Sequence, residues 1–319
     1  MKNLILCLAS LCSITLLSAA EVDHFTRRNE ELSDSSALLN QKANEAVSLV
    51  IDKLNHVSPG CKPEALYPEL RYYFANAMSG AFTKDVIAND LFIKREIFVS
   101  DSVYQDWGFF DGASLGLQVM QRLGVSISPL VRVGNIVVGT DKFEHMFGRG
   151  YKYFVKNYIE SKGIMNAVKF GIFGEKFILG GLKFETGVFS YGDLSANFNG
   201  MRFWNHMLQK HDDILGAQYN VGPYIYCKNN QWVKGKDIDF TNYIDNAFDE
   251  GINCSKFTNP KALAKFTSRI NGMGFSCPIR PEAIAPLLNK YGPLSKWLIN
   301  QAGNGVLKLT GEFQNKMND

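Results

Sequence analysis

The sequence lacks several features that would define its class directly. Its formal net charge is only +3 over 319 residues and its basic residues are scattered, so no electrostatic footprint for nucleic acid is present. Beyond residue 20 no apolar run is long and uniform enough to predict a membrane span. The sequence also has no His-Glu-x-x-His run, internal repeat or low-complexity tract. We therefore do not expect a nucleic-acid-binding, membrane-spanning or repeat protein.

Residues 1–20 are typical of a secretory signal peptide. Lys2 precedes an apolar run from Leu4 to Leu17, and the small residues Ser18-Ala19-Ala20 favour cleavage before Glu21. Cleavage would leave 33 basic against 31 acidic residues, a net charge of +2. We expect an exported protein, periplasmic or secreted, with little net charge.

Cysteine is scarce: the chain has six, and two of them lie in the predicted signal peptide. The other four are Cys61, Cys227, Cys254 and Cys277. An even number in an oxidising compartment predicts two disulfides with three possible connectivities, and free thiols are the alternative. Because Cys227 and Cys254 follow neighbouring predicted elements, we expect them to pair, which leaves Cys61 for Cys277. None of the four has metal-site spacing.

The remaining composition predicts an α+β fold that is mostly helical. The chain is 46% hydrophobic, enough for one large core or two modest ones. We divide it into an N-terminal helical arm at residues 21–60 and a main domain at 61–319 with a C-terminal helical extension. Asn229-Asn230 between two strand-like segments predicts a hairpin, and residues 131–138 are a candidate strand.

A predicted helix ending in a glutamate is the most informative chemical feature. Apolar residues recur there at a spacing of three and four: Ile164, Ala167, Val168, Ile172 and Phe173. Glu175 falls in the last turn, where the helix dipole disfavours a second negative charge. Enclosure by Phe173, Phe177 and Phe189 would raise its pKa further, as a general acid near neutral pH requires. The alternative is a solvated surface acid.

A β-hairpin is predicted directly after this helix. Gly180-Gly181 lies between two short apolar stretches, residues 176–179 and 182–184, and paired glycines permit the positive φ angles of a tight turn. The helix and hairpin together would place Glu175 against a cleft.

The segment Ser190-Tyr191-Gly192-Asp193-Leu194-Ser195-Ala196-Asn197 resembles the Tyr-Gly-x-Leu-x-x-Asn strand of animal-type lysozymes. In those enzymes the strand follows the helix of the catalytic glutamate after a short interval. The resemblance implies a lysozyme-superfamily glycoside hydrolase with a lysozyme-like domain and Glu175 as its acid. As a whole the chain looks most like the lysozymes of predatory bacteria that prefer deacetylated peptidoglycan.

The chain departs from this pattern at Ser190, where animal lysozymes have an aspartate. Goose-type lysozymes and lytic transglycosylases, which share the fold, also lack that acid. A two-carboxylate mechanism would have to recruit Asp193, Glu185 or Glu144, and these acids could also receive the ammonium of a deacetylated sugar. The alternatives are that Asp193 caps a helix reaching Leu208 and that Glu185 lies on a solvated strand face.

A second motif lies upstream, in Asp141-Lys142-Phe143-Glu144-His145. Asp141 and His145 are four residues apart and share one helix face, so they can hydrogen-bond. Similar Asp-Lys-Phe-x-His helices, followed by a Ser-Tyr-x-Asp-Leu-x-Ala-Asn segment, occur in bacterial envelope proteins, which this chain resembles over residues 139–204. That resemblance implies that the helix faces residues 190–197.

Three interpretations of this motif remain open. His145 is a buried histidine satisfied by Asp141, or Glu144 or the Asp141–His145 pair supplies the second acid or base, or the pair belongs to a metal site. Two ligands at helical spacing do not make a metal site, so we expect no metal and no cofactor.

We therefore expect a hydrolase of peptidoglycan glycan strands, acting as a monomer. The expected catalytic residues are Glu175, Glu144 and Asp193, and the expected glycan-binding residues are Asp141, His145, Glu185, Ser190, Tyr191 and Asn197. The alternative is a non-catalytic periplasmic envelope protein in which both motifs are structural. The sequence leaves hydrolysis and transglycosylation equally open.

Overall fold

The computed structural model describes residues 21–58, 60–76, 78–108, 111, 124, 126–179 and 186–308. It confirms an α+β protein in which helices dominate and the sheets are small. The predicted signal peptide, the Gly180-Gly181 turn and Glu185 lie outside these residues. In the described part of the chain, no helix has the length and apolar character needed to cross a membrane.

The helices follow the apolar patterns of the sequence. The longer ones are α2 (Ser36–Val57), α3 (Pro63–Tyr73), α4 (Ala81–Ala88), α8 (Ile164–Gly174), α9 (Tyr191–Leu208), α10 (Pro260–Gly272) and α11 (Ile284–Tyr291). The shorter segments are α12 (Ser295–Leu298) and the 3₁₀ turns η5 (Ala217–Tyr219), η6 (Phe240–Asn242), η7 (Asn246–Phe248), η8 (Pro281–Ala283) and η9 (Gly292–Leu294). Pro260, Pro281 and Pro293 lie in the first turns of α10, η8 and η9, where the missing backbone N–H of proline costs no hydrogen bond.

π-helical turns interrupt two of the helical segments. One segment runs through α6 (Asp141–Glu144), η2 (His145–Arg149), α7 (Gly150–Phe154) and η3 (Val155–Ile159), and α8 continues into η4 (Glu175–Leu179). The prediction that residues 176–179 form the first strand of a hairpin is therefore wrong. A short apolar run cannot be distinguished from a buried helical turn by its pattern alone. Because π turns are frequent at functional sites, the positions where η2 and η4 begin are informative.

The strands form three small sheets. β1 (Leu130–Val133) and β2 (Ile136–Gly139) are an antiparallel pair, as are β4 (Ile225–Lys228) and β5 (Gln231–Lys234). The β4–β5 turn is Asn229-Asn230, with φ of 52° and 62°, which confirms the predicted hairpin. The third sheet joins β3 (Val188–Phe189), β6 (Lys256–Phe257) and β7 (Gly305–Val306) in that order.

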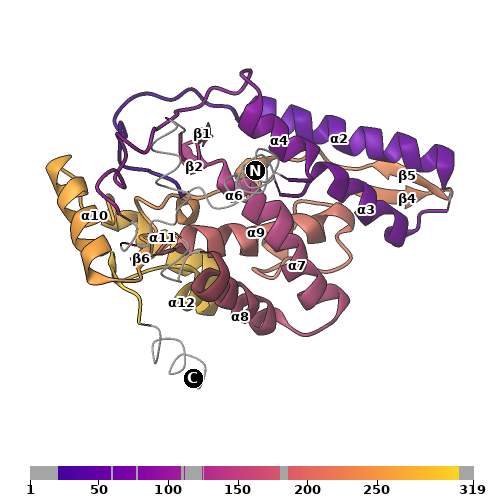
Figure 1. Cartoon of the computed structure of the whole chain (residues 1–319). Helices are drawn as coiled ribbons and strands as arrows, with labels where there is room; N and C mark the ends of the chain where they lie inside the picture. The colour runs from indigo at the N-terminus through magenta and orange to yellow at the C-terminus, as the bar shows by residue number, and fades with distance from the viewer. Residues whose placement is uncertain are drawn as a thin grey trace, which may run out of the picture.

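Two disulfides form, as expected, but the expected connectivity is wrong. Cys61 pairs with Cys227, and Cys254 pairs with Cys277. The β4–β5 hairpin lies against the end of α2 (Figure 1), where the Asn55 side chain exchanges two 2.8 Å hydrogen bonds with the Trp232 backbone. This docking places Cys227 beside the α2–α3 turn, a long-range contact that residue spacing cannot show. Two disulfides are compatible with export.

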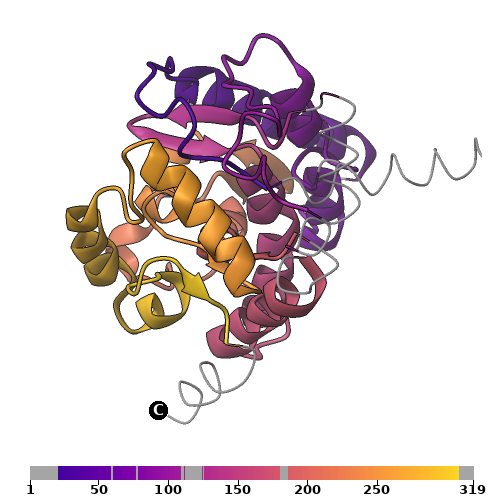
Figure 2. The ribbon, with the colours of Figure 1, turned by 60° about the vertical axis from the view of Figure 1, so that its left-hand side comes forward.

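The apolar side chains form two clusters. The larger one joins α2, α3, α4, α7, α8 and α9, and the smaller one lies beneath α10. Strand β3 touches both, since Phe189 belongs to the larger cluster and Val188 to the smaller one. Figure 2 shows the C-terminal segments from α10 to β7 on one side of the molecule and the N-terminal helices on another. Residues 21–60, the expected arm, contribute to both clusters.

Glycines allow the η2–α7 segment to pack closely on α9. A Cβ on Gly200 would lie 1.9 Å from the carbonyl oxygen of Met146, and a Cβ on Gly150 would lie 2.6 Å from Cα of Gly200. Neither position has room for a side chain. The close crossing brings the His145 turn against the first turns of α9.

Candidate active site

The segment 190–197 begins a helix. Ser190 is the N-cap of α9, and its Oγ accepts a 3.0 Å hydrogen bond from the backbone N–H of Asp193. The prediction of a lysozyme-like strand at these residues is therefore wrong. The alternative prediction, that Asp193 is the N-cap of the helix, is also wrong, because the N-cap is Ser190. The predicted helix to Leu208 is confirmed, with its start at Tyr191. Because Ser190 caps the helix, the carboxyl group of Asp193 is not used for capping and contacts other residues of the site.

A buried lysine occupies the centre of the site. The ammonium of Lys142, a residue only 1% exposed, donates to Asp141 Oδ2 at 2.6 Å, to Asp193 Oδ1 at 2.5 Å and to Glu250 Oε1 at 2.6 Å. Burial lowers the pKa of Lys142, but the three carboxylates outweigh burial and hold it well above its usual value. Lys142 therefore carries a full charge inside the protein.

Two of these carboxylates have further partners that fix their positions. Glu250 accepts hydrogen bonds from Ser190 Oγ at 2.6 Å and from Ser255 Oγ at 2.9 Å. Ser128 Oγ donates to Oδ1 of Asp141 at 3.2 Å and accepts from the backbone N–H of the same residue at 3.0 Å. Asp141 pairs with Lys142 and Ser128 in the described contacts, where the sequence suggested His145 as its partner.

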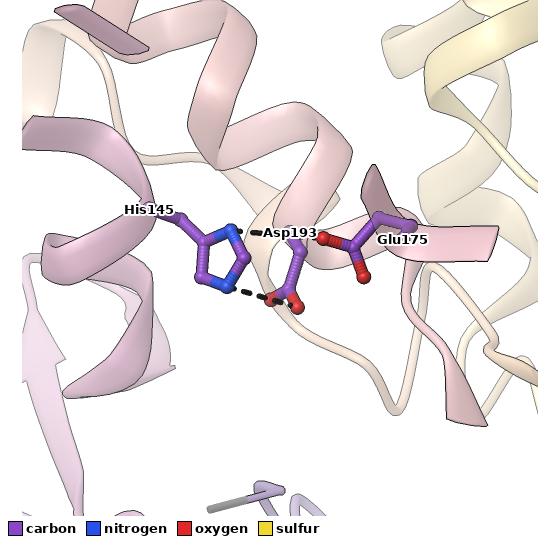
Figure 3. A group of neighbouring side chains, drawn as sticks. All are labelled: His145, Glu175 and Asp193. Carbon is purple, nitrogen blue, oxygen red and sulfur yellow. Dashed lines mark ion pairs between the residues drawn. The ribbon is translucent and has the colours of Figure 1, made fainter. Parts of the chain in front are cut away.

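His145 joins the two motifs that the sequence predicts to face each other. Its Nε2 lies 3.2 Å from Asp193 Oδ2, and its Nδ1 lies 3.1 Å from Asn197 Oδ1. Its Nδ1 also lies 3.9 Å from Glu175 Oε1. Figure 3 shows the carboxyl groups of Glu175 and Asp193 pointing toward the same imidazole. The predicted juxtaposition of the helix around residues 141–145 with residues 190–197 is confirmed.

Glu175 is enclosed, although two of the phenylalanines that the sequence suggests around it, Phe173 and Phe177, are exposed. It is only 1% exposed, whereas Phe173 and Phe177 are 54% and 40% exposed and pack against each other with ring centroids 5.0 Å apart. Burial, followed by the charge of Asp193, raises the pKa of Glu175 well above its ordinary value. The nearby Arg149 acts in the opposite direction. The structure therefore supports a protonated Glu175 at pH values where exposed glutamates are ionised.

Asp193 has the opposite electrostatic environment. Burial raises its pKa, but the charges of His145 and Lys142 and the hydrogen bond from Lys142 outweigh burial, so that its pKa lies below the ordinary value. The pKa values of two neighbouring carboxyl groups are thus shifted in opposite directions. Such separation of pKa values is characteristic of acid–base pairs in enzymes.

One buried oxygen of the site, Oε1 of Glu175, has no hydrogen-bond partner among the described residues. Tyr153 lies close by: its hydroxyl lies against α8, because a Cβ on Gly171 would overlap it, and Asn197 is a side-chain hydrogen-bond partner of this tyrosine. An unsatisfied buried polar group is uncommon in proteins, and at Glu175 it is consistent with a binding or catalytic role.

Glu21 adds a further carboxyl group to the site. Burial, then the charges of Glu250 and Asp193, raises its pKa well above the ordinary value, and Thr186 donates a hydrogen bond to it. Its backbone carbonyl accepts a 3.1 Å hydrogen bond from Ser128 N–H. The predicted cleavage before Glu21 would place the new N-terminal residue next to this site.

Two groups of side chains could hold a metal ion on distance alone. They are His145, Glu175 and Asp193, and Asp141, Asp193 and Glu250, in each of which the candidate ligand atoms lie within 4.8 Å of one another. The Lys142 ammonium already supplies positive charge to the second group. A divalent ion on Asp193 would be repelled by that ammonium, which already contacts Oδ1 of the same carboxyl group. Proton chemistry fits the site better.

The remaining predicted residues have other positions. Ser190 and Tyr191 are buried; Ser190 contacts Glu250, and the Tyr191 ring packs on Phe189 at 5.2 Å. Glu144 is half-buried and precedes His145 on the helix, so the two side chains diverge by about 100°. Glu185 lies outside the described residues.

Sequence reasoning missed Lys142, Glu250 and Glu21 as site residues. Lys142 had an available signal, because it is three residues before His145 and therefore on a similar helix face. Glu250 and Glu21 reach the site only through long-range packing, which leaves no local pattern.

Comparisons with known proteins find no family model, no curated protein and no solved structure that matches this chain. The resemblance to the lysozyme superfamily therefore stays a prediction.

Proposed function

We propose that this protein is a glycoside hydrolase acting on the glycan strands of peptidoglycan, with Glu175 as general acid and Asp193 as the second carboxylate. In this reaction Glu175 protonates the glycosidic oxygen while Asp193 stabilises or attacks the anomeric carbon. No cofactor takes part. The periplasm or the exterior of the cell is the proposed place of action.

The observation that carries the proposal is the carboxyl group of Glu175. It is almost fully buried, its Oε1 has no hydrogen-bond partner among the described residues, its pKa is raised, and it faces Asp193, whose pKa is lowered. A general acid must retain its proton near neutral pH and must have an oxygen available to the leaving group. The raised pKa and the unpaired oxygen support this role for Glu175.

The spacing of the two carboxyl groups favours a retaining mechanism. Candidate ligand atoms of Glu175 and Asp193 lie within 4.8 Å of each other. Retaining glycosidases place their carboxyl groups about 5–5.5 Å apart, whereas inverting enzymes need about 6.5–9.5 Å to accommodate a water. We therefore propose that Asp193 acts as nucleophile, in place of the aspartate that Ser190 replaces.

The deacetylated form of the glycan is the preferred substrate in this proposal. A deacetylated sugar has no acetamido oxygen to displace the leaving group, so the reaction needs a protein carboxylate or an activated water, and Asp193 is the carboxylate proposed here. Its ammonium also suits a site that contains several carboxyl groups. Because Glu175 is enclosed, the site must open for a glycan strand to enter.

Purified peptidoglycan, native and chemically deacetylated, provides the test. Wild-type protein should release soluble fragments, and their masses distinguish hydrolysis, which adds water, from transglycosylation, which does not. Glu175→Gln should lose at least 100-fold in rate while remaining folded. Glu144→Gln is the matched control, since Glu144 lies next to His145 in the chain and is the other glutamate that the sequence suggested as a catalytic acid.

The rival function is that of a non-catalytic envelope protein in which the same contacts only join helices. The extensive hydrogen bonding of Lys142 and Glu250 is the observation that favours it. Under this rival, wild type and Glu175→Gln would release equal and negligible amounts of fragment.

A further inference from the structure

Lys142 differs from an ordinary buried ion-pair partner in the number of groups that it joins. An ammonium has three N–H donors, and each of the three carboxylates that contact it lies within 2.5–2.6 Å. These carboxylates come from α6, from the first turn of α9 and from the segment after η7. The donor capacity of Lys142 is therefore fully used, and it fixes three parts of the chain to one point.

Packing restricts the lysine stem as well as its charge. A Cβ on Gly192 would lie 3.1 Å from Cε of Lys142 and 3.1 Å from Cγ of Glu250. The backbone of the first turn of α9 therefore lies directly against the stem. The ammonium cannot move far from Asp193 without displacing this backbone.

The two oxygens of Asp193 have different partners. Oδ1 accepts from Lys142, and Oδ2 lies 3.2 Å from Nε2 of His145. Rotation of the carboxyl group would lose both contacts at once. Lys142 and His145, three residues apart on one helical segment, thus hold the plane of the Asp193 carboxyl group from its two sides.

We propose that Lys142 is a positioning residue: its ammonium holds Oδ1 of Asp193, so that Oδ2 stays directed toward His145. The catalytic meaning of this arrangement rests on the proposed function. The hold of Lys142 on Asp193 is a property of the site that can be measured without any substrate.

Several other charged groups face Asp193 and must be kept constant in a test. They are Asp141 from α6, His145 from η2, Glu175 from η4, Glu250 from the segment after η7, and Glu21 from the N-terminal segment. A comparison of variants that differ only at residue 142 isolates the lysine from all of these.

The experiment compares Glu250→Gln with the double variant Lys142→Met, Glu250→Gln. Removing one carboxylate together with the ammonium leaves two acids, Asp141 and Asp193, without their cation instead of three, and near-UV circular dichroism checks that the double variant folds. Carbon-13 NMR of labelled aspartate carboxyl groups follows the titration of Asp193. Lys265→Met, which removes a lysine paired with Asp111 near α10, controls for loss of a lysine elsewhere.

We expect the midpoint of the Asp193 titration to rise by at least one pH unit in the double variant relative to Glu250→Gln. The acidic limb of the pH profile of kcat/KM should move upward by the same amount, while Lys265→Met leaves both unchanged. Equal Asp193 midpoints in the two Glu250→Gln backgrounds would overturn the inference, even if wild type cleaves glycan. If the midpoint of the Asp193 titration rises as expected but the wild-type protein cleaves no glycan, the positioning role of Lys142 stands and the proposed function is rejected.

Discussion

Oε1 of Glu175 lies 3.9 Å from Nδ1 of His145, and each of these residues begins a π-helical turn. A π turn shifts the direction of side chains relative to the preceding α-helical turns. In this protein the two shifts coincide with the point where η4 and η2 approach the N-terminus of α9. Two of the π turns therefore begin at residues of the candidate site.

The raised pKa of Glu175 predicts a stability gain when the acid is removed. Its pKa in the folded protein exceeds the ordinary value of 4.5, so the stabilising contribution is complete below pH 4.5 and is lost as pH rises toward the folded-state pKa. Glu175→Gln should therefore match wild type at pH 4. Between pH 4.5 and the folded-state pKa of Glu175, the free energy of unfolding of Glu175→Gln should rise relative to wild type by about 1.4 kcal/mol per pH unit. Urea denaturation at several pH values measures the difference, and a constant difference would contradict this account.

Asp193 should show the opposite pH dependence. Its pKa is lowered in the folded protein, so it contributes stability above its ordinary value of 3.8, and that contribution disappears as pH falls through the folded-state pKa. The free energy of unfolding of Asp193→Asn should be about 3 kcal/mol lower than that of wild type at pH 7, because the ion pair with the buried ammonium of Lys142 is broken. The loss should shrink below pH 3.8. A loss that stays the same at low pH would indicate that Asp193 is not ionised in the native state.

The two disulfides should differ in their contribution to stability. Cys61–Cys227 spans 166 residues of sequence and Cys254–Cys277 spans 23. On the chain-entropy model, closing these loops contributes about 5 and about 3.4 kcal/mol respectively. Replacing Cys61 and Cys227 by alanine should therefore lower the free energy of unfolding more than replacing Cys254 and Cys277. Guanidinium titration of the two double variants measures the order, and the reverse order would show that strain or residual unfolded structure dominates.

Chelators should have no effect on glycan cleavage. Lys142 supplies positive charge beside Asp193, so the account requires no ion at His145, Glu175 and Asp193. Dialysis against EDTA should leave the rate within twofold of the untreated protein, and added Zn²⁺ should not increase it. Loss of activity with EDTA, restored by a metal, would replace proton transfer by metal-assisted hydrolysis.

The sequence predicts much of the framework. Helix spacing identifies α8 and α9, and Asn229-Asn230 identifies the β4–β5 hairpin, because these signals are local. The pairing of the Asp141–His145 motif with residues 190–197 is confirmed through Lys142 and His145. Enclosure of Glu175 is also confirmed, although Phe173 and Phe177 point outward.

The errors have a common physical origin. The disulfide connectivity depends on where the β4–β5 hairpin docks. The conformation of residues 176–179 depends on whether a short apolar run packs as a helix or as a strand. Glu250 and Glu21 join the site from distant parts of the chain. Each of these outcomes is decided by tertiary packing, which overrides local propensity.

The most direct test of the central claim is the ratio of glycan cleavage rates in Glu175→Gln and Glu144→Gln, measured on deacetylated peptidoglycan near neutral pH with both proteins folded. The account predicts that Glu175→Gln falls at least 100-fold below wild type, while Glu144→Gln stays within threefold of it. Equal rates in Glu175→Gln and wild type, or a selective loss in Glu144→Gln, would contradict the assignment of Glu175 as the acid.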